Sequence, residues 1–265
     1  MTPNLFVTLW PSFPHFQQFA HDPRLAGIRL NSAMMNHPDI ERELDIIKAT
    51  KPTVPLYFDV KGRQLRVTEV LPNPEYLDIR INHPIHVPTP TPVLLKAGSD
   101  AGLLGLISEN GFRLTFAQNP RWNVKAGESL HIKHPLLQVG GPIFTDAEKA
   151  KIAKVRGLVD RWFISYVEDE RDLLEFQELV PNAAEIFLKI ESKQGLDFAQ
   201  HHFQPQHNTR LVAACGDLFV EIDEPHLILA ANQTILKADP NALVGSRLLL
   251  STCRTPSSYL QNQIS

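Results

Sequence analysis

The sequence predicts an α/β fold: a TIM-type (β/α) barrel with a small β domain inserted after its third strand. Two observations predict it. Short apolar runs alternate with amphipathic segments over most of the 265 residues, an order typical of a parallel sheet. One proline-rich block interrupts this order with strand-like pieces and turns. We therefore assign residues 1–66 and 143–265 to the barrel domain and residues 67–142 to an inserted β lid domain.

Seven apolar runs are expected to be the barrel strands, and the amphipathic segments between them the helices. The predicted strands are residues 5–9, 28–30, 54–58, 162–167, 186–190, 211–214 and 243–244. The predicted helices include residues 39–47, 146–155, 170–179 and 226–237. Thr145 followed by Glu148 is a capping-box pattern, which marks the start of a helix.

The insertion is expected to contain short strands at residues 76–81, 93–96, 103–107 and 112–116. Turns are predicted at Gly98-Ser99-Asp100 and Glu109-Asn110-Gly111. A module inserted beside the C-terminal ends of barrel strands can act as a lid that excludes water during chemistry. The alternative is a passive bulge.

An eighth barrel strand is not evident, since residues 252–265 are polar and weakly patterned. The sequence therefore leaves open whether the predicted barrel is complete, because its last strand is missing from the pattern. Seven parallel strands leave two sheet edges that native proteins rarely leave uncovered. The C-terminal tail, a partner subunit of a homo-oligomer, or irregular pairing of the first and seventh strands could close the gap.

Composition indicates a cytoplasmic protein whose partners are small molecules. The net charge of -3 argues against a nucleic-acid or anionic-membrane partner, and no apolar stretch is long enough to span a membrane. Cys215 and Cys253 provide neither a disulfide framework nor a zinc spacing. The N-terminal residues lack the pattern of a signal peptide.

Two acids mark the ends of neighbouring predicted strands. Glu191 closes one apolar run in Lys189-Ile190-Glu191, and Asp217 follows the next run in Gly216-Asp217-Leu218. The C-terminal ends of barrel strands form the functional mouth, so the two carboxylates are expected to converge. They would suit Mg²⁺, and Lys189 beside the ion could meet an anionic substrate. The alternative is a structural ion pair or two solvated carboxylates.

Several segments in order resemble pyruvate kinase. The matching segments are Thr8-Leu-Trp-Pro-Ser12, Gly27-Ile-Arg-Leu-Asn31, Asp59-Val-Lys-Gly62 with Leu65-Arg66, Phe163-Ile-Ser-Tyr-Val167, Lys189-Ile-Glu191, Cys215-Gly-Asp-Leu-Phe-Val-Glu221 and, more weakly, Val244-Gly-Ser-Arg-Leu248. The resemblance covers almost the whole chain. It stops before that family's last barrel strand and its C-terminal regulatory domain.

The resemblance implies a role for each matching residue. It implies that Glu191 and Asp217 bind Mg²⁺ or Mn²⁺, and that Lys189 holds the transferring phosphoryl group. It assigns the substrate phosphate to Arg29 and the nucleotide phosphates to Arg66, and it places Lys61 at the substrate. The backbone N–H groups of Gly216 and Asp217, with Ser246, would hold the substrate carboxylate. Asn31 and Asp59 belong to a potassium pocket.

The departures from the family pattern fall mostly on the nucleotide and potassium side. Ala33 stands where a serine hydroxyl is expected, and Met34 replaces a histidine near the nucleotide. Gly62-Arg63-Gln64 replaces Gly-Pro-Glu, so a nearby positive charge is an alternative to K⁺. Cys215-Gly-Asp-Leu-Phe219 lacks an arginine and a glycine of the family's segment.

Three functions remain open. The first is Mg²⁺-dependent phosphoryl transfer between phosphoenolpyruvate and ADP through a pyruvate enolate, which matches the charge neutralisation that such transfer requires. The second is a lyase or aldolase that uses the same metal and enolate. The third is a non-catalytic relative.

Other candidate residues favour structural interpretations. His201, His202 and His207 fit no standard zinc spacing, so an exposed loop is favoured over a metal site. Cys215 has no recognisable base beside it, which favours an inert thiol over a nucleophile. No Walker-type loop or dinucleotide fingerprint is present, so a nucleotide would bind in the lid cleft.

Overall fold

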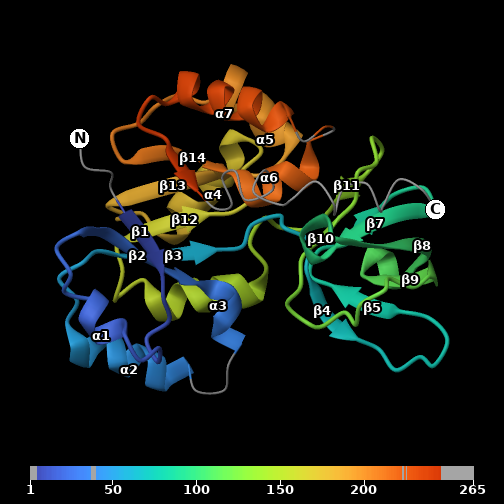
Figure 1. Cartoon of the computed structure of the whole chain (residues 1–265), viewed down its shortest axis with the longest axis horizontal. Coiled ribbons are helices and arrows are strands. Elements are labelled where there is room, and N and C mark those ends of the chain that lie inside the picture. The colour runs from blue at the N-terminus through green and yellow to red at the C-terminus, as the bar shows by residue number, and fades with distance from the viewer. Residues whose placement is uncertain (1–4, 37–39, 223, 225, 246–265) are drawn as a thin grey trace, which may run out of the picture.

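The computed structural model describes residues 5–36, 40–222, 224 and 226–245. They form an α/β fold in which a seven-stranded parallel sheet curls into a half-barrel, an incomplete TIM-like barrel, with an antiparallel β half-barrel inserted after its third strand (Figure 1). The strands lie in the order β1 (Leu5–Thr8), β2 (Leu25–Asn31), β3 (Leu56–Val60), β12 (Arg161–Ile164), β13 (Glu185–Ile190), β14 (Thr209–Ala214) and β15 (Leu243–Gly245).

Helices cover the convex face of this sheet because alternate strand residues are apolar on that side. In β13, Ile186, Leu188 and Ile190 are fully buried in the core shared with the helices. The helices are α1 (Phe16–Phe19), α2 (Ile40–Thr50), α3 (Asp146–Val155), α4 (Glu170–Leu179), α5 (Lys193–His201), α6 (Cys215–Glu221) and α7 (Leu227–Ala238), with a 3-10 turn η1 (Ser32–Asn36) after β2.

Local capping fixes where two of these helices begin. The Thr145 hydroxyl accepts a hydrogen bond from the backbone N–H of Glu148, 3.3 Å away, at the start of α3. Asp169 and Asp172 form a capping box at the start of α4. The bounds predicted for α3 and α4 are confirmed.

Several predicted boundaries are wrong by a few residues. The strand expected at 162–167 ends at Ile164, because Tyr166 adopts a positive φ of 55° that no strand continues through. The strand expected at 54–58 lies at Leu56–Val60. The helix expected at 39–47 spans Ile40–Thr50, and residue 39 lies outside the described residues.

Aromatic side chains fill the concave face midway along the strands. Tyr57, Phe163 and Phe187 come from three adjacent strands, and the rings of Phe163 and Phe187 stack with centroids 4.9 Å apart. Phe6 from β1 packs edge-on against all three rings. This layer separates the two ends of the half-barrel interior.

The insertion has its own hydrophobic core. Its strands are β4 (Val67–Val70), β5 (Asp78–Ile81), β6 (Ile85–His86), β7 (Thr91–Leu95), β8 (Asp100–Ser108), β9 (Arg113–Gln118), β10 (Leu130–His131) and β11 (Gln138–Val139). Six of them form one antiparallel sheet in the order β10-β7-β8-β9-β5-β4. The turn predicted at Glu109-Asn110-Gly111 is confirmed as η3 (Glu109–Gly111), with Asn110 at positive φ. The turn predicted at Gly98-Ser99-Asp100 lies two residues earlier, as η2 (Lys96–Gly98), because Asp100 already begins β8.

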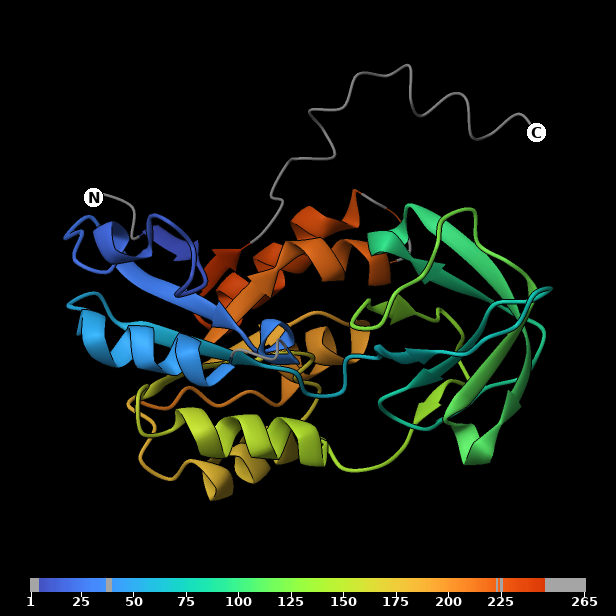
Figure 2. The ribbon, with the colours of Figure 1, turned by 90° about the horizontal axis from the view of Figure 1, so that it is seen from below.

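The insertion lies against the C-terminal end of the barrel strands (Figure 2). Its turn η2 contacts α6, where Gly98 lies against Val220. The Lys133 ammonium donates to the backbone carbonyl of Ile222 at 2.7 Å. These contacts place the insertion where the predicted lid would have to be.

The half-barrel has two edges, β1 and β15, among the residues that the structure describes. The structure describes seven strands in this sheet, and residues 252–265, which the sequence offers as one way to close the gap, lie outside the described residues. None of the described helices is long and apolar enough to cross a membrane.

Candidate functional site

Asp59 is the centre of a cluster of charged side chains at the C-terminal ends of β2, β3, β12 and β13. Its carboxylate is fully buried. The Arg29 guanidinium donates to Oδ2 through Nε at 2.8 Å and also through Nη2, and the Lys61 ammonium donates to the same oxygen at 3.0 Å. Lys189 Nζ lies 3.6 Å from it. Three cations from the ends of β2, β3 and β13 therefore surround one carboxylate.

Strand alternation brings these side chains to the same face. Asp59 and Lys189 lie two residues after Tyr57 and Phe187 on the same strands, and Arg29 pairs with Tyr57 in register, so all three are on the concave face. The Ser165 hydroxyl, at the end of β12, donates to Asp59 Oδ1 at 3.0 Å and accepts from Lys189 at 2.9 Å. Ser165 lies in the segment Phe163–Val167, which resembles pyruvate kinase, but strand alternation alone does not predict that its hydroxyl links Asp59 to Lys189.

Glu191 lies on the other side of Lys189 and is almost completely buried. Its Oε1 is 2.8 Å from the Lys189 ammonium, and its Oε2 accepts from the backbone N–H of Tyr166 at 2.9 Å. Lys189 and Glu191 share a face, as strand alternation predicts, and form a buried ion pair. Lys189 bridges the Asp59 cluster and the acid pair.

Burial and neighbouring charges shift the pKa values of this cluster in different directions. Burial would raise the pKa of Asp59, but Lys189, Lys61 and Arg29 hold it well below its ordinary value. Burial lowers the pKa of Lys61 to about 8 although Asp59 opposes the shift. Asp59 and Glu191 outweigh burial at Lys189 and raise its pKa.

The pKa of Glu191 is raised to about 7. Burial is the largest cause, and the nearby negative charge of Asp217 adds to it, while Lys189 opposes the shift. Lys189 stays protonated because Asp59, in addition to Glu191, stabilises its positive charge. A buried carboxylate whose pKa is strongly perturbed by burial and a neighbouring charge is a candidate functional group.

Asp217 lies in the first turn of α6, directly after β14. Its Oδ2 accepts a long hydrogen bond, 3.4 Å, from the Gln64 amide. Gln64 in turn accepts from the Arg66 guanidinium, which also donates to the carbonyl of Gly127 in the insertion. Arg66 thus lies at the hinge of the insertion and contacts neutral groups.

His131 joins the site from the insertion, and no feature of the sequence indicated it. Its side chain is fully buried. Nδ1 lies 2.6 Å from Glu221 Oε1 and 3.0 Å from the Tyr166 hydroxyl, whereas Nε2 lies 3.9 Å from Asp217 Oδ1. Burial raises the pKa of Tyr166 well above its ordinary value, and Glu221 and Asp217 add to the shift.

Glu148 is a second residue that the sequence interpretation missed. The capping-box pattern assigned its side chain to the start of α3, but the carboxylate instead accepts from the Ser32 hydroxyl at 3.0 Å and the Lys61 backbone N–H at 3.1 Å. Lys151 lies 2.7 Å from its other oxygen. Glu148 therefore fixes the backbone from which Lys61 reaches Asp59.

Glu191 and Asp217 offer carboxylate oxygens, the donor atoms that a divalent cation prefers, and a cation at Glu191 would share its oxygens with Lys189 and the backbone N–H of Tyr166. Mg²⁺ is commonly held by one or two carboxylates, with water and substrate oxygens completing its shell. The buried Nε2 of His131 has no hydrogen-bond partner and lies beside Asp217, which indicates that a polar group belongs there. No group of three or more His, Cys, Asp or Glu side chains within the described ranges is arranged to hold a metal by itself.

The residues are a poor fit for K⁺. Both oxygens of Asp59 already accept hydrogen bonds, and three cations lie within 4 Å of Oδ2. Asn31 Oδ1 accepts from the backbone N–H of Ala33. Lys61 supplies the positive charge at this position, whereas Arg63 pairs with Asp172 on α4.

The structure also bears on the predicted carboxylate contacts, on Cys215 and on the exposed histidines. Gly216 lies in the first turn of α6, and Ser246 lies outside the described residues. Cys215 is buried and its thiol donates to Asn232; burial raises its pKa, in agreement with an inert thiol. His201 and His202 are exposed, but the loop prediction is wrong for His201, which ends α5.

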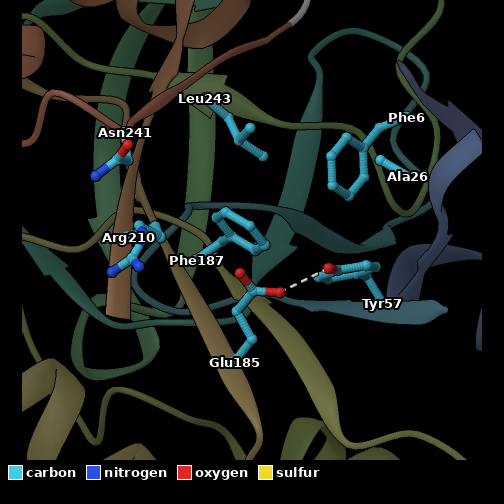
Figure 3. Close-up of a pocket in the computed structure, with 8 residues that line it drawn as sticks. All are labelled: Phe6, Ala26, Tyr57, Glu185, Phe187, Arg210, Asn241 and Leu243. Carbon is cyan, nitrogen blue, oxygen red and sulfur yellow. Dashed lines mark hydrogen bonds between the residues drawn. The ribbon is translucent and has the colours of Figure 1, made fainter. Parts of the chain in front are cut away.

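A separate cavity of about 440 Å³ opens at the opposite end of the strands (Figure 3). Its charged groups are already engaged: Glu185 accepts from the Tyr57 hydroxyl at 2.6 Å, and Arg210 donates to backbone carbonyls. The aromatic layer lies between this cavity and Asp59. The charged cluster, not the cavity, therefore has the chemistry of a reactive site.

No protein-family model matches the chain, and no curated protein matches it. Function is therefore inferred from the geometry of the site.

Proposed function

We propose that the protein is a Mg²⁺-dependent enzyme of the pyruvate-kinase type, which transfers a phosphoryl group between phosphoenolpyruvate and ADP through a pyruvate enolate. The single observation that carries this proposal is the Asp59 cluster, in which Arg29, Lys61 and Lys189 converge beside the acid pair Glu191 and Asp217. The ordered sequence resemblance to pyruvate kinase supports it.

The charges have separate roles in this proposal. Arg29, Lys61 and Lys189 carry three positive charges against those of Asp59 and Glu191, and the remaining positive charge favours an anion such as a phosphoryl group. Glu191 and Asp217 would hold the divalent cation. A cation bound there would act as a Lewis acid on the oxygen that becomes the enolate oxygen. Gly216, Asp217 and Ser246 remain the predicted contacts of the substrate carboxylate.

The experiment is an exchange measurement. Incubation of the protein with pyruvate and Mg²⁺ in deuterated water is expected to reduce the methyl proton signal in NMR spectra, since enolate formation exchanges these protons. Glu191→Gln should abolish the exchange if Glu191 holds the cation. Glu185→Gln is the matched control, because Glu185 occupies the same face and the opposite end of β13. Unchanged exchange in Glu191→Gln would exclude the assigned role.

A lyase or aldolase is the second candidate, and the position of Arg66 favours it. Its guanidinium donates to Gln64 and to the carbonyl of Gly127, so the residue predicted to meet nucleotide phosphates is engaged at the hinge of the insertion. The enolate side of the site does not depend on that residue.

Consumption of phosphoenolpyruvate with and without ADP separates the candidates. ADP-dependent consumption with formation of pyruvate supports the kinase. Pyruvate exchange without any ADP-dependent reaction supports the lyase. Absence of exchange together with absence of Mn²⁺ binding supports a non-catalytic relative and excludes both enzymes.

A further inference from the structure

The two ring nitrogens of His131 differ in their contacts. Nδ1 contacts both Glu221 and Tyr166, whereas Nε2 has no hydrogen-bond partner. Glu221 carries a carboxylate, which can only accept, so the 2.6 Å contact requires that Nδ1 donates its proton to Glu221. The Tyr166 hydroxyl lies 3.0 Å from the same nitrogen and 3.3 Å from the same carboxylate oxygen. These contacts fix the orientation of the ring, so that Nε2 points towards Asp217.

Nε2 is buried without a hydrogen-bond partner and lies 3.9 Å from Asp217 Oδ1. In the neutral ring that donates through Nδ1, Nε2 is an acceptor, and so is the carboxylate. A buried acceptor without a donor is costly, and native structures usually satisfy it with water or an ion. A single donor with two protons would satisfy both acceptors at this distance. Water bound to a cation is such a donor.

We propose that His131 is an outer partner of the divalent cation, with its Nε2 accepting a hydrogen bond from a water that the cation carries beside Asp217. The inference rests on the proposed function, because the cation is the one assigned to Glu191 and Asp217. Mg²⁺ retains several waters when it is held by few carboxylates. Residues that bind such waters orient the ligands and strengthen metal binding.

This role makes the cation site depend on the inserted domain. His131 lies on β10 of the insertion, whereas Glu221 and Asp217 lie on α6 and Tyr166 follows β12. Lys133, two residues further along the same segment, holds it to α6 through the carbonyl of Ile222. The insertion thereby contributes a group to the site in addition to covering it.

The test measures Mn²⁺ affinity by electron paramagnetic resonance on the full chain. His131→Asn keeps an amide that can donate to Glu221 in place of Nδ1, but it leaves no acceptor at the position of Nε2. His131→Gln places an amide oxygen near that position. We expect the dissociation constant for Mn²⁺ to rise about tenfold or more in His131→Asn. It should stay close to the wild-type value in His131→Gln.

Lys133→Met is the matched control, because it removes a contact between the same segment and α6 without altering His131. It should weaken Mn²⁺ binding far less than His131→Asn does. Equal affinity in wild type and His131→Asn would overturn this inference and leave the proposed function standing. Equal weakening in His131→Asn, His131→Gln and Lys133→Met would also overturn it, because docking of the segment would then be the cause. Absence of Mn²⁺ binding to the wild type would overturn the proposed cation site itself.

Discussion

At the scale of single residues, Asp59 holds the charged site together. Its carboxylate is the shared partner of three cations, two of which are buried lysines. Without it, Arg29, Lys61 and Lys189 would repel one another in a setting with little water. Removal of one partner from a buried ionic network leaves uncompensated charge, which is far more costly than the loss of an exposed ion pair.

Asp59→Asn is therefore expected to lower the free energy of unfolding by about 3–5 kcal/mol. Urea denaturation followed by circular dichroism measures this loss. Asp22→Asn is the control, because Asp22 also pairs with an arginine, but that arginine is exposed. Asp22→Asn should lower the free energy of unfolding by only a small fraction of the loss in Asp59→Asn. Similar losses in both variants would contradict the role of Asp59 as the centre of a buried ionic network.

Glu191 gives a second expectation at this scale, which concerns pH. Its pKa is about 7 in the folded protein and 4.5 ordinarily, so the folded state binds more protons between these values. The stabilisation is present below pH 4.5 and is lost as the pH rises through 7. In metal-free buffer, the free energy of unfolding of the wild type should fall relative to Glu191→Gln on the order of 3 kcal/mol from pH 4.5 to 8.

Parallel urea titrations across this range measure the difference between the two proteins. The exposed Glu41 provides the control, since Glu41→Gln should leave the pH dependence of the wild type unchanged. Parallel curves for wild type and Glu191→Gln would show that burial does not raise the pKa of Glu191.

At the scale of elements, the close approach of two strand ends determines where Lys61 and Ser165 lie. Gly62 follows Lys61 directly after β3, and a Cβ atom at this position would lie only 2.5 Å from the carbonyl oxygen of Ser165. The backbone cannot yield without moving one of the two strand ends. Glycine is required here because of space, and the same contact keeps the two site residues together.

Gly62→Ala is expected to lower the free energy of unfolding by about 1–3 kcal/mol, as overpacking in a core does. It should also weaken exchange of pyruvate protons, because it displaces Lys61 from Asp59. Gly157→Ala is the control, since no atom lies within 4 Å of an added Cβ there. It should leave stability unchanged or raise it slightly. Thermal unfolding measures the stability of both variants. Equal stability of Gly62→Ala and Gly157→Ala would show that the close approach of Gly62 to Ser165 does not require glycine.

At the scale of the whole molecule, two separate hydrophobic cores support one site. The barrel core contains Trp162 and Phe176, and the insertion core contains Leu104 and Phe116. The described contacts between the two parts are concentrated at α6, next to Asp217. We therefore expect the insertion to be able to lose its packing while the barrel stays folded.

Phe116→Ala should increase hydrogen exchange mainly within residues 67–142 and leave the barrel strands protected. The reason is that the cavity it creates lies in the insertion core alone. Hydrogen-exchange mass spectrometry measures the effect by region. Phe176→Ala should show the reverse pattern. Uniform loss of protection in Phe116→Ala would show that the two cores unfold as one.

The sequence by itself determined the fold class, the seven barrel strands and the place of the insertion. It could do so because strand and helix periodicities are local and because buried parallel strands are apolar along their length. It also placed Lys189 and Glu191 on one face, since residues two apart in a strand share a face, whereas the ion pair between them is seen only in the structure. The strand-end position of Asp217 follows from the same kind of local pattern.

Only the tertiary structure decided which side chains meet across distant segments. Glu148 and Lys61 are 87 positions apart, and His131 and Glu221 are 90 apart. No local pattern encodes such contacts. The structure also showed that Lys61 is held at Asp59, where the sequence comparison had expected K⁺ or a charge from Arg63. Local sequence fixes which face of an element a residue occupies, but packing between elements fixes its partner.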